Sequence, residues 1–127
     1  DVPSLVTSEG KFVSTYSQLI EKIADFSADD LEKELMAQFE RFRQYAGRLP
    51  DHLDSHHRAV YMHPAAYAIM VKIAQEHQLP IRKHAVLTED YGFDSKLISN
   101  LNATLAQYGQ PKTCDYTVDF IFDFESE

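Results

Sequence analysis

The chain is organised around the stretch Pro50-Asp51-His52-Leu53-Asp54-Ser55-His56-His57-Arg58, with His63-Pro64 close behind. If Leu49 to His56 forms a strand, its side chains alternate between two faces. One face then carries His52, Asp54 and His56, and the other carries Leu53 and Ser55. The alternation therefore gathers on one surface three groups that can bind a metal or transfer a proton.

Helical patterns lie on both sides of this stretch. Before it, Ser14 or Thr15 is expected to cap a short helix with an apolar stripe of Leu19, Ile20 and Ile23. Ser27 and Asp30 form a capping-box pattern that begins a longer helix, and Gly47 ends it. After it, the expected helices run from Pro64 to His77-Gln78 and from Ser95 to Gly109.

Strand and loop signals complete the pattern. A short strand is expected at Leu79 to Arg82, and the clean alternation from Tyr116 to Phe124 predicts another. The turn signals from Val2 to Val13 predict an extended loop or a short hairpin, and Lys83 to Asp94 is expected to be a loop. Helix and strand alternate as in a parallel α/β sheet, so we predict an α/β fold.

Composition limits the classes of function. With 127 residues, 44% hydrophobic and 25% charged, the chain is expected to form one globular domain. A formal charge of -8 opposes binding to nucleic acid phosphates. No apolar stretch has the length that spans a membrane, so a soluble protein without a membrane partner is expected. Cys114 stands alone, which excludes an intramolecular disulfide and favours a reducing, cytoplasmic setting.

Position favours a functional site over a solvated group of histidines. In parallel α/β units, functional groups gather at the carboxyl ends of strands, where the proposed strand reaches a loop. His57 points to the opposite face and is a surface or supporting residue. His63, just before Pro64, either satisfies the helix entry or contacts a ligand. Arg58 is either solvated or binds an anionic or hydroxyl-rich ligand.

The same residues resemble a known family. The run from His52 to His57, preceded by Pro50 and followed by a proline-initiated helix and Leu79-Pro80-Ile81-Arg82, is similar to the histidine motif of the YdjC-like carbohydrate deacetylases, which include chitooligosaccharide deacetylases. The segments Val2 to Val6 and Glu9 to Phe12 resemble the part that the family places before the helix leading to this motif. The resemblance covers essentially the whole chain.

The resemblance implies a metal-dependent hydrolase that removes acetyl from N-acetylated sugars, built on an incomplete (β/α) barrel of parallel strands with flanking helices. In the family, a divalent ion, Mg²⁺ or Zn²⁺, is held by an aspartate of an Ala-Asp-Asp-Phe-Gly-like motif and a histidine of a Gly-x-His segment. The histidine of Asp-Ser-His is the third ligand, and His56 is its only counterpart here. Residues 1–127 are thus expected to be a single domain from the middle of such an enzyme, truncated at both ends.

The resemblance also implies roles for the neighbouring residues. His52 and Asp54 would be catalytic or orienting groups beside the metal ligand His56. Candidate substrate contacts are His57, Arg58, His63 and Arg82; at Arg58 the family usually has another histidine. Catalytic zinc takes three protein ligands, so one ligand argues against activity of the chain by itself. The expected partners are a small-molecule or oligosaccharide substrate and a second copy of the chain in a homodimer.

Two other interpretations remain open. The chain can be a non-catalytic α/β interaction module whose exposed sheet edges drive self-association, because an unpaired strand templates another. It can also belong to a different metal-assisted sugar hydrolase that uses the same strand.

Overall fold

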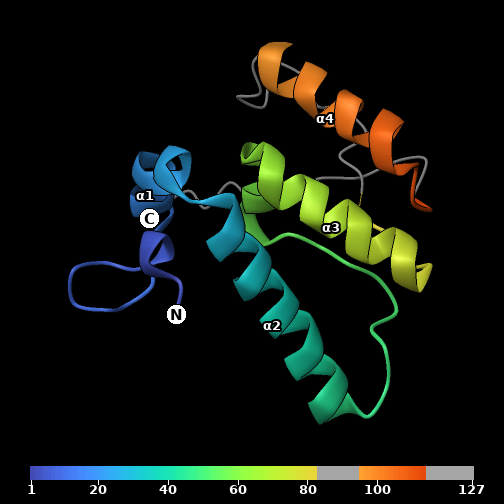
Figure 1. Cartoon of the computed structure of the whole chain (residues 1–127), viewed down its shortest axis with the longest axis horizontal. Coiled ribbons are helices and arrows are strands. Elements are labelled where there is room, and N and C mark those ends of the chain that lie inside the picture. Colours follow the sequence, from blue (N-terminus) through green and yellow to red (C-terminus); the bar gives the residue numbers. More distant parts are fainter. Residues whose placement is uncertain (83–94, 114–127) are drawn as a thin grey trace, which may run out of the picture.

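The computed structural model describes residues 1–82 and 95–113, apart from the side chain of His57. The expected loop at 83–94 and the expected strand at 116–124 lie outside these residues. In Figure 1, the middle one of the three long helices packs against the other two. The helical elements are η1 (Pro3–Leu5), α1 (Tyr16–Lys22), η2 (Ile23–Asp25), α2 (Ala28–Ala46), η3 (His56–Met62), α3 (Pro64–His77) and α4 (Ser95–Tyr108).

Helix α2 begins and ends where its sequence signals predict. The Ser27 side chain accepts a hydrogen bond from the Asp30 N–H at 3.1 Å, and Gly47 ends the helix in the left-handed conformation at φ 65°. The return bond of a capping box is not made, because the Asp30 carboxylate accepts a bond from the Ser4 N–H at 2.7 Å. The Ser27 N–H instead donates to the Ser4 hydroxyl at 2.9 Å. The start of α2 is therefore bound to η1.

The N-terminal segment forms the expected short hairpin. Val6 and Phe12 make an antiparallel bridge, and the Thr7 N–H donates to the Lys11 carbonyl at 2.8 Å. Thr15 caps α1 by accepting from the Gln18 N–H at 3.3 Å. The predicted apolar stripe of α1 is only half covered, because Ile20 stays 46% exposed.

The predicted strand at Leu49 to His56 is much shorter in the structure. Only Leu53 pairs, in a parallel bridge with Ile81, and Ile81 makes a second parallel bridge with Thr113. Pro50 has no N–H to donate to a ladder. At the other end, the Ser55 carbonyl accepts from the Arg58 N–H at 3.2 Å, so the chain turns into η3 at His56.

Helix α3 lies between two apolar clusters, so it is buried on more than one face. The first cluster joins α3 to α4 and includes Val71 and Leu101, both 0% exposed. The second joins α3 to α2 and η1 and includes Phe39 and Ile73. Leu53 is packed against both clusters. The stretch that carries the histidines is therefore anchored on the core from two sides.

The described residues form a mainly helical structure with a few parallel pairings. The predicted helices before and after the histidine stretch are confirmed, and the predicted short strand at Leu79 to Arg82 contributes one paired residue, Ile81. Within residues 1–82 and 95–113, no helix combines the length and the apolar character needed to cross a membrane. The incomplete (β/α) barrel of parallel strands stays a prediction.

Candidate functional site

Asp54 and Arg82 meet at the carboxyl ends of two neighbouring parallel segments. They directly follow the bridged residues Leu53 and Ile81, and Arg82 Nη2 lies 3.2 Å from Asp54 Oδ2. The Leu53 N–H donates to the Pro80 carbonyl at 2.9 Å, and the Arg82 N–H donates to the Leu53 carbonyl at 3.1 Å. The backbone pairing therefore sets the separation of the two charged groups.

Both members of this pair have further support. The Ser55 N–H donates to Asp54 Oδ1 at 2.7 Å, so both carboxylate oxygens are engaged. The hydroxyl of the buried Tyr61 donates to the main-chain carbonyl of Arg82. The two side chains are 34% and 53% exposed. Asp54 is thus held in one orientation while it stays accessible to a ligand.

His52 and Asp54 share a cavity that we call the histidine cavity. It has a volume of about 530 Å³ and lies between α2 and the stretch from Pro50 to Asp54. Its polar lining includes His52, Asp54 and Gln38, and its apolar wall includes Phe39 and Ile73. A cavity with a mainly apolar wall and a few polar groups is typical of a small-molecule site.

His56 is not in this cavity. The strand geometry that would place it on the face of His52 and Asp54 ends at Ser55, and His56 is the exposed first residue of η3. The sequence-based placement of all three groups on one strand face is therefore wrong, although His56 is only two residues from Asp54.

Arg58 has an unusual backbone conformation. Its φ is 61°, in the left-handed region that residues other than glycine, asparagine and aspartate seldom adopt. Such conformations cost free energy and tend to occur at functional sites. The Arg58 side chain is half-buried. The side chain of His57 lies outside the described part of the structure.

His63 lies in a second, apolar cavity. It precedes α3, and its carbonyl accepts from the Tyr67 N–H at 3.0 Å. The cavity has a volume of about 270 Å³ and is lined mainly by apolar side chains of the hairpin, α1, α2 and η3. Burial lowers the pKa of His63, and a hydrogen bond with the Phe26 backbone opposes this shift. Burial therefore favours the neutral form of the imidazole.

The described residues do not form a complete metal site. No group of three or more His, Cys, Asp or Glu side chains within 1–82 and 95–113 is placed to hold a metal ion. Catalytic zinc sites use three protein ligands and a water. A metal ion bound by His56 would therefore need further ligands from outside these residues. The described residues alone assign no reaction step to such an ion.

Two contributors to the site have no clear signal in the sequence. Tyr61 supports the backbone of Arg82 from η3, and Gln38 reaches the histidine cavity from the middle of α2. Tyr61 acts on a main-chain atom far along the chain, and Gln38 is one of many polar residues on a helix.

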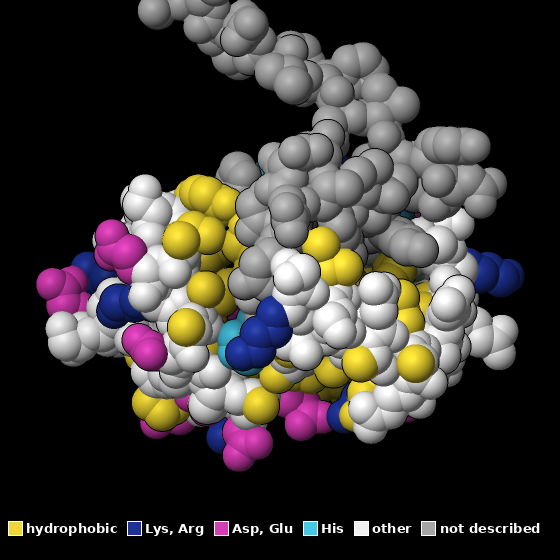
Figure 2. Space-filling model, turned by 90° about the horizontal axis from the view of Figure 1, so that it is seen from above, with side chains coloured by type: hydrophobic (Ala, Val, Ile, Leu, Met, Phe, Trp, Pro, Cys, Tyr) yellow, Lys and Arg dark blue, Asp and Glu magenta, His cyan; other side chains and the backbone are white. Residues whose placement is uncertain are grey.

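Figure 2 shows a histidine beside Lys or Arg side chains at the centre of one face, with hydrophobic side chains on both sides.

Comparisons with known proteins agree on one family. The model of the family described as YdjC-like protein matches residues 1–124. A carbohydrate deacetylase of Geobacillus stearothermophilus is 40% identical over 82 residues, which are 65% of this chain and 31% of that protein. A chitooligosaccharide deacetylase of Serratia marcescens is 38% identical over 81 residues, which are 64% of this chain and 31% of that protein.

A solved structure is also similar to this chain in fold. A crystal structure from Enterococcus faecalis V583, described as a candidate cellobiose-phosphate cleavage protein, superposes with a TM-score of 0.63 at 27% identity. The match covers 91% of this chain and 38% of that one. The chain spans a little under a third of the length of the curated relatives named above. Because the family model spans nearly the whole chain, the chain belongs to the YdjC-like protein family.

Proposed function

We propose that this chain is part of a metal-dependent carbohydrate deacetylase, a hydrolase that cleaves the C–N amide bond of N-acetylated sugars such as chitooligosaccharides. The family and the names of the relatives support the carbohydrate deacetylase class. The structural observation that carries the proposal is the Asp54–Arg82 pair beside His52, at the carboxyl ends of parallel segments. Functional groups of parallel α/β proteins gather at this edge.

The reaction needs groups that orient a neutral substrate and move protons. Water adds to the acetamide carbonyl carbon, the C–N bond breaks, and the leaving nitrogen takes up a proton, which releases acetate and an amine. Asp54, oriented by Arg82, can accept a hydrogen bond from a sugar hydroxyl or hold a donor in place. The imidazole of His52 can donate or accept a hydrogen bond in the same cavity.

His56 is proposed as one ligand of a divalent ion, Mg²⁺ or Zn²⁺, whose other ligands come from outside the described residues. Such an ion would polarise the acetamide carbonyl. His57, Arg58 and Arg82 are proposed substrate contacts at the same edge. A contact by His63 requires that a ligand also reach the apolar cavity. We further propose a partial (β/α) barrel, a homodimer and a cytoplasmic location.

The experiment is a His56→Ala substitution in the protein that contains this chain, with acetate release from a chitooligosaccharide as the readout. We expect loss of the metal-dependent activity and weaker binding of Zn²⁺ by calorimetry. His77→Gln is the control for the loss of a histidine elsewhere, because His77 lies at the end of α3 and lines none of the cavities described. Its ring stacks on Phe39 with the ring centroids 4.7 Å apart, so circular dichroism should check that this variant keeps its fold. Near-normal activity of the His56→Ala protein would refute the ligand assignment.

A further inference from the structure

A third hollow continues the surface of the histidine cavity along α2. We call it the α2 groove, and its volume is about 820 Å³. Gln38 lines the histidine cavity, the apolar cavity and the α2 groove. Phe12 and Glu34 line both the groove and the apolar cavity. The side chain of Gln38 is therefore the junction between the proposed reaction site and the outer face of α2.

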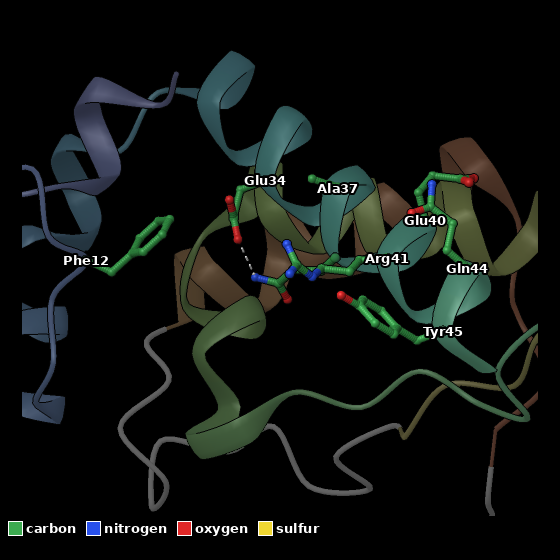
Figure 3. Close-up of a pocket in the computed structure, with 8 residues that line it drawn as sticks. Phe12, Glu34, Ala37, Glu40, Arg41, Gln44 and Tyr45 are labelled. Atoms are coloured by element: carbon green, nitrogen blue, oxygen red, sulfur yellow. Dashed lines mark hydrogen bonds between the residues drawn. The ribbon is translucent and has the colours of Figure 1, made fainter.

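Two aromatic rings border the α2 groove. Phe12, at the hairpin, is 52% exposed, and Tyr45, near the end of α2, is 79% exposed. Figure 3 shows Phe12 at one end and Tyr45 towards the other, with Glu34 and Arg41 between them. The C–H groups of a sugar ring are attracted to the electron-rich face of an aromatic ring, so exposed rings can stack on sugars.

The polar groups between the rings suit hydroxyl and amide groups. The Gln38 amide donates to Glu34 Oε1 at 2.8 Å, which leaves its own carbonyl oxygen and the second Glu34 oxygen as acceptors. The Arg41 guanidinium lies 5.5 Å from the centre of the Tyr45 ring, and Gln44 adds another amide. The charged groups that line the groove are two carboxylates, Glu34 and Glu40, and one guanidinium, Arg41, and the chain carries a net charge of -8. These charges favour an uncharged polar ligand over a phosphate or another polyanion.

We propose that the α2 groove binds the outer sugar units of a neutral N-acetylated oligosaccharide whose reacting unit lies in the histidine cavity. Tyr45 and Phe12 stack on sugar rings, and Gln38 contacts the chain where it leaves the reaction site. This inference rests on the proposed function, because it assigns the groove to the same substrate. The volume of the α2 groove lies within the range of about 300–1,000 Å³ that ligand pockets occupy.

The test is calorimetric titration of the full chain with the fully acetylated pentamer of N-acetylglucosamine. We expect binding by the unaltered chain and a dissociation constant at least tenfold higher for Tyr45→Ala. Tyr45→Phe keeps the ring and should bind within threefold of the unaltered chain. Tyr16→Ala is the matched control, because Tyr16 is also an exposed aromatic residue, at 48%, and lines none of the three hollows.

The outcomes separate this inference from the proposed reaction. No binding of the pentamer, or equal binding by the unaltered chain and the Tyr45→Ala variant, overturns the groove assignment whatever the activity of the enzyme. Binding that Tyr45→Ala weakens supports the groove even if His56→Ala leaves acetate release intact. Circular dichroism should be unchanged by Tyr45→Ala, because the side chain is 79% exposed. A Gln38→Ala variant gives a second test and should also weaken binding.

Discussion

The Asp54–Arg82 pair offers a test that distinguishes a reaction site from a structural contact. The charged atoms are 3.2 Å apart, which corresponds to an attraction of roughly 1 kcal/mol at the dielectric constant of water and about 5 kcal/mol at an effective value of 20. With side chains 34% and 53% exposed, solvent screening and lost side-chain freedom leave about 0.2–1 kcal/mol. Arg82→Ala also keeps the bond from Tyr61, because that bond ends on the main-chain carbonyl.

We therefore expect Asp54→Asn and Arg82→Ala each to lower the free energy of unfolding of the chain by about 1 kcal/mol or less. Under the proposed function, Asp54→Asn in the protein that contains this chain should lower kcat/KM for deacetylation by about 100-fold or more, the usual effect of losing a proton-transfer or orienting group. Urea denaturation and acetate release measure the two effects.

Lys11→Ala is the control for Arg82→Ala, because it breaks a 3.3 Å exposed pair with Glu9, and neither residue lines the histidine cavity or the α2 groove. It should affect stability slightly and activity not at all. The reasoning is refuted if Asp54→Asn retains activity within threefold of the unaltered enzyme. It is also refuted if the stability loss exceeds about 2 kcal/mol, since the pair would then be a structural contact.

Three further predictions concern stability, each measured by urea denaturation. Leu101→Ala should cost about 2–5 kcal/mol, because Leu101 is 0% exposed in the core between α3 and α4; a loss below about 1 kcal/mol would contradict that packing. Ser27→Ala removes the cap of α2 and should cost about 0.5–2 kcal/mol, and an unchanged midpoint would show that the cap is dispensable. The lowered pKa of His63 means that the unfolded chain binds the proton more tightly, so stability should fall as the pH drops below the ordinary value of 6.5 towards the pKa in the folded state. His63→Gln should remove this part of the pH dependence of stability. A stability profile that the substitution leaves unaltered would contradict its assignment to His63.

Helices could be predicted from the sequence because their signals are local. Ser27 and Gly47 mark the ends of α2 within one turn, and Pro64 marks the start of α3. The strand at Leu49 to His56 was predicted too long, because pairing depends on partners far along the chain. Leu53 pairs with Ile81. Ser55 instead begins a turn, in which its carbonyl accepts a hydrogen bond from the Arg58 N–H and its hydroxyl accepts one from the Val60 N–H.

The sequence could indicate a candidate stretch but not the arrangement of its side chains. The pattern of His52, Asp54 and His56 predicted one shared face, and the structure brings His52 and Asp54, but not His56, into one cavity. Alternation along a strand could not show that His56 begins η3, nor that Arg58 adopts a left-handed conformation more usual for glycine. Arg82 was a candidate only by resemblance, because an ion pair between distant residues depends on the fold.

The packing explains how the described residues hold a charged pair in place before any ligand binds. Leu53 contacts both apolar clusters, so the backbone that carries Asp54 is fixed from two sides of α3. Tyr61 is 1% exposed and binds the carbonyl of Arg82, which fixes the opposite segment. Charged groups held in place beforehand need little reorganisation during a reaction, which is the main electrostatic advantage of an enzyme site over water. Asp54 and Arg82 have this support on the core, whereas His56 lies at the exposed start of η3.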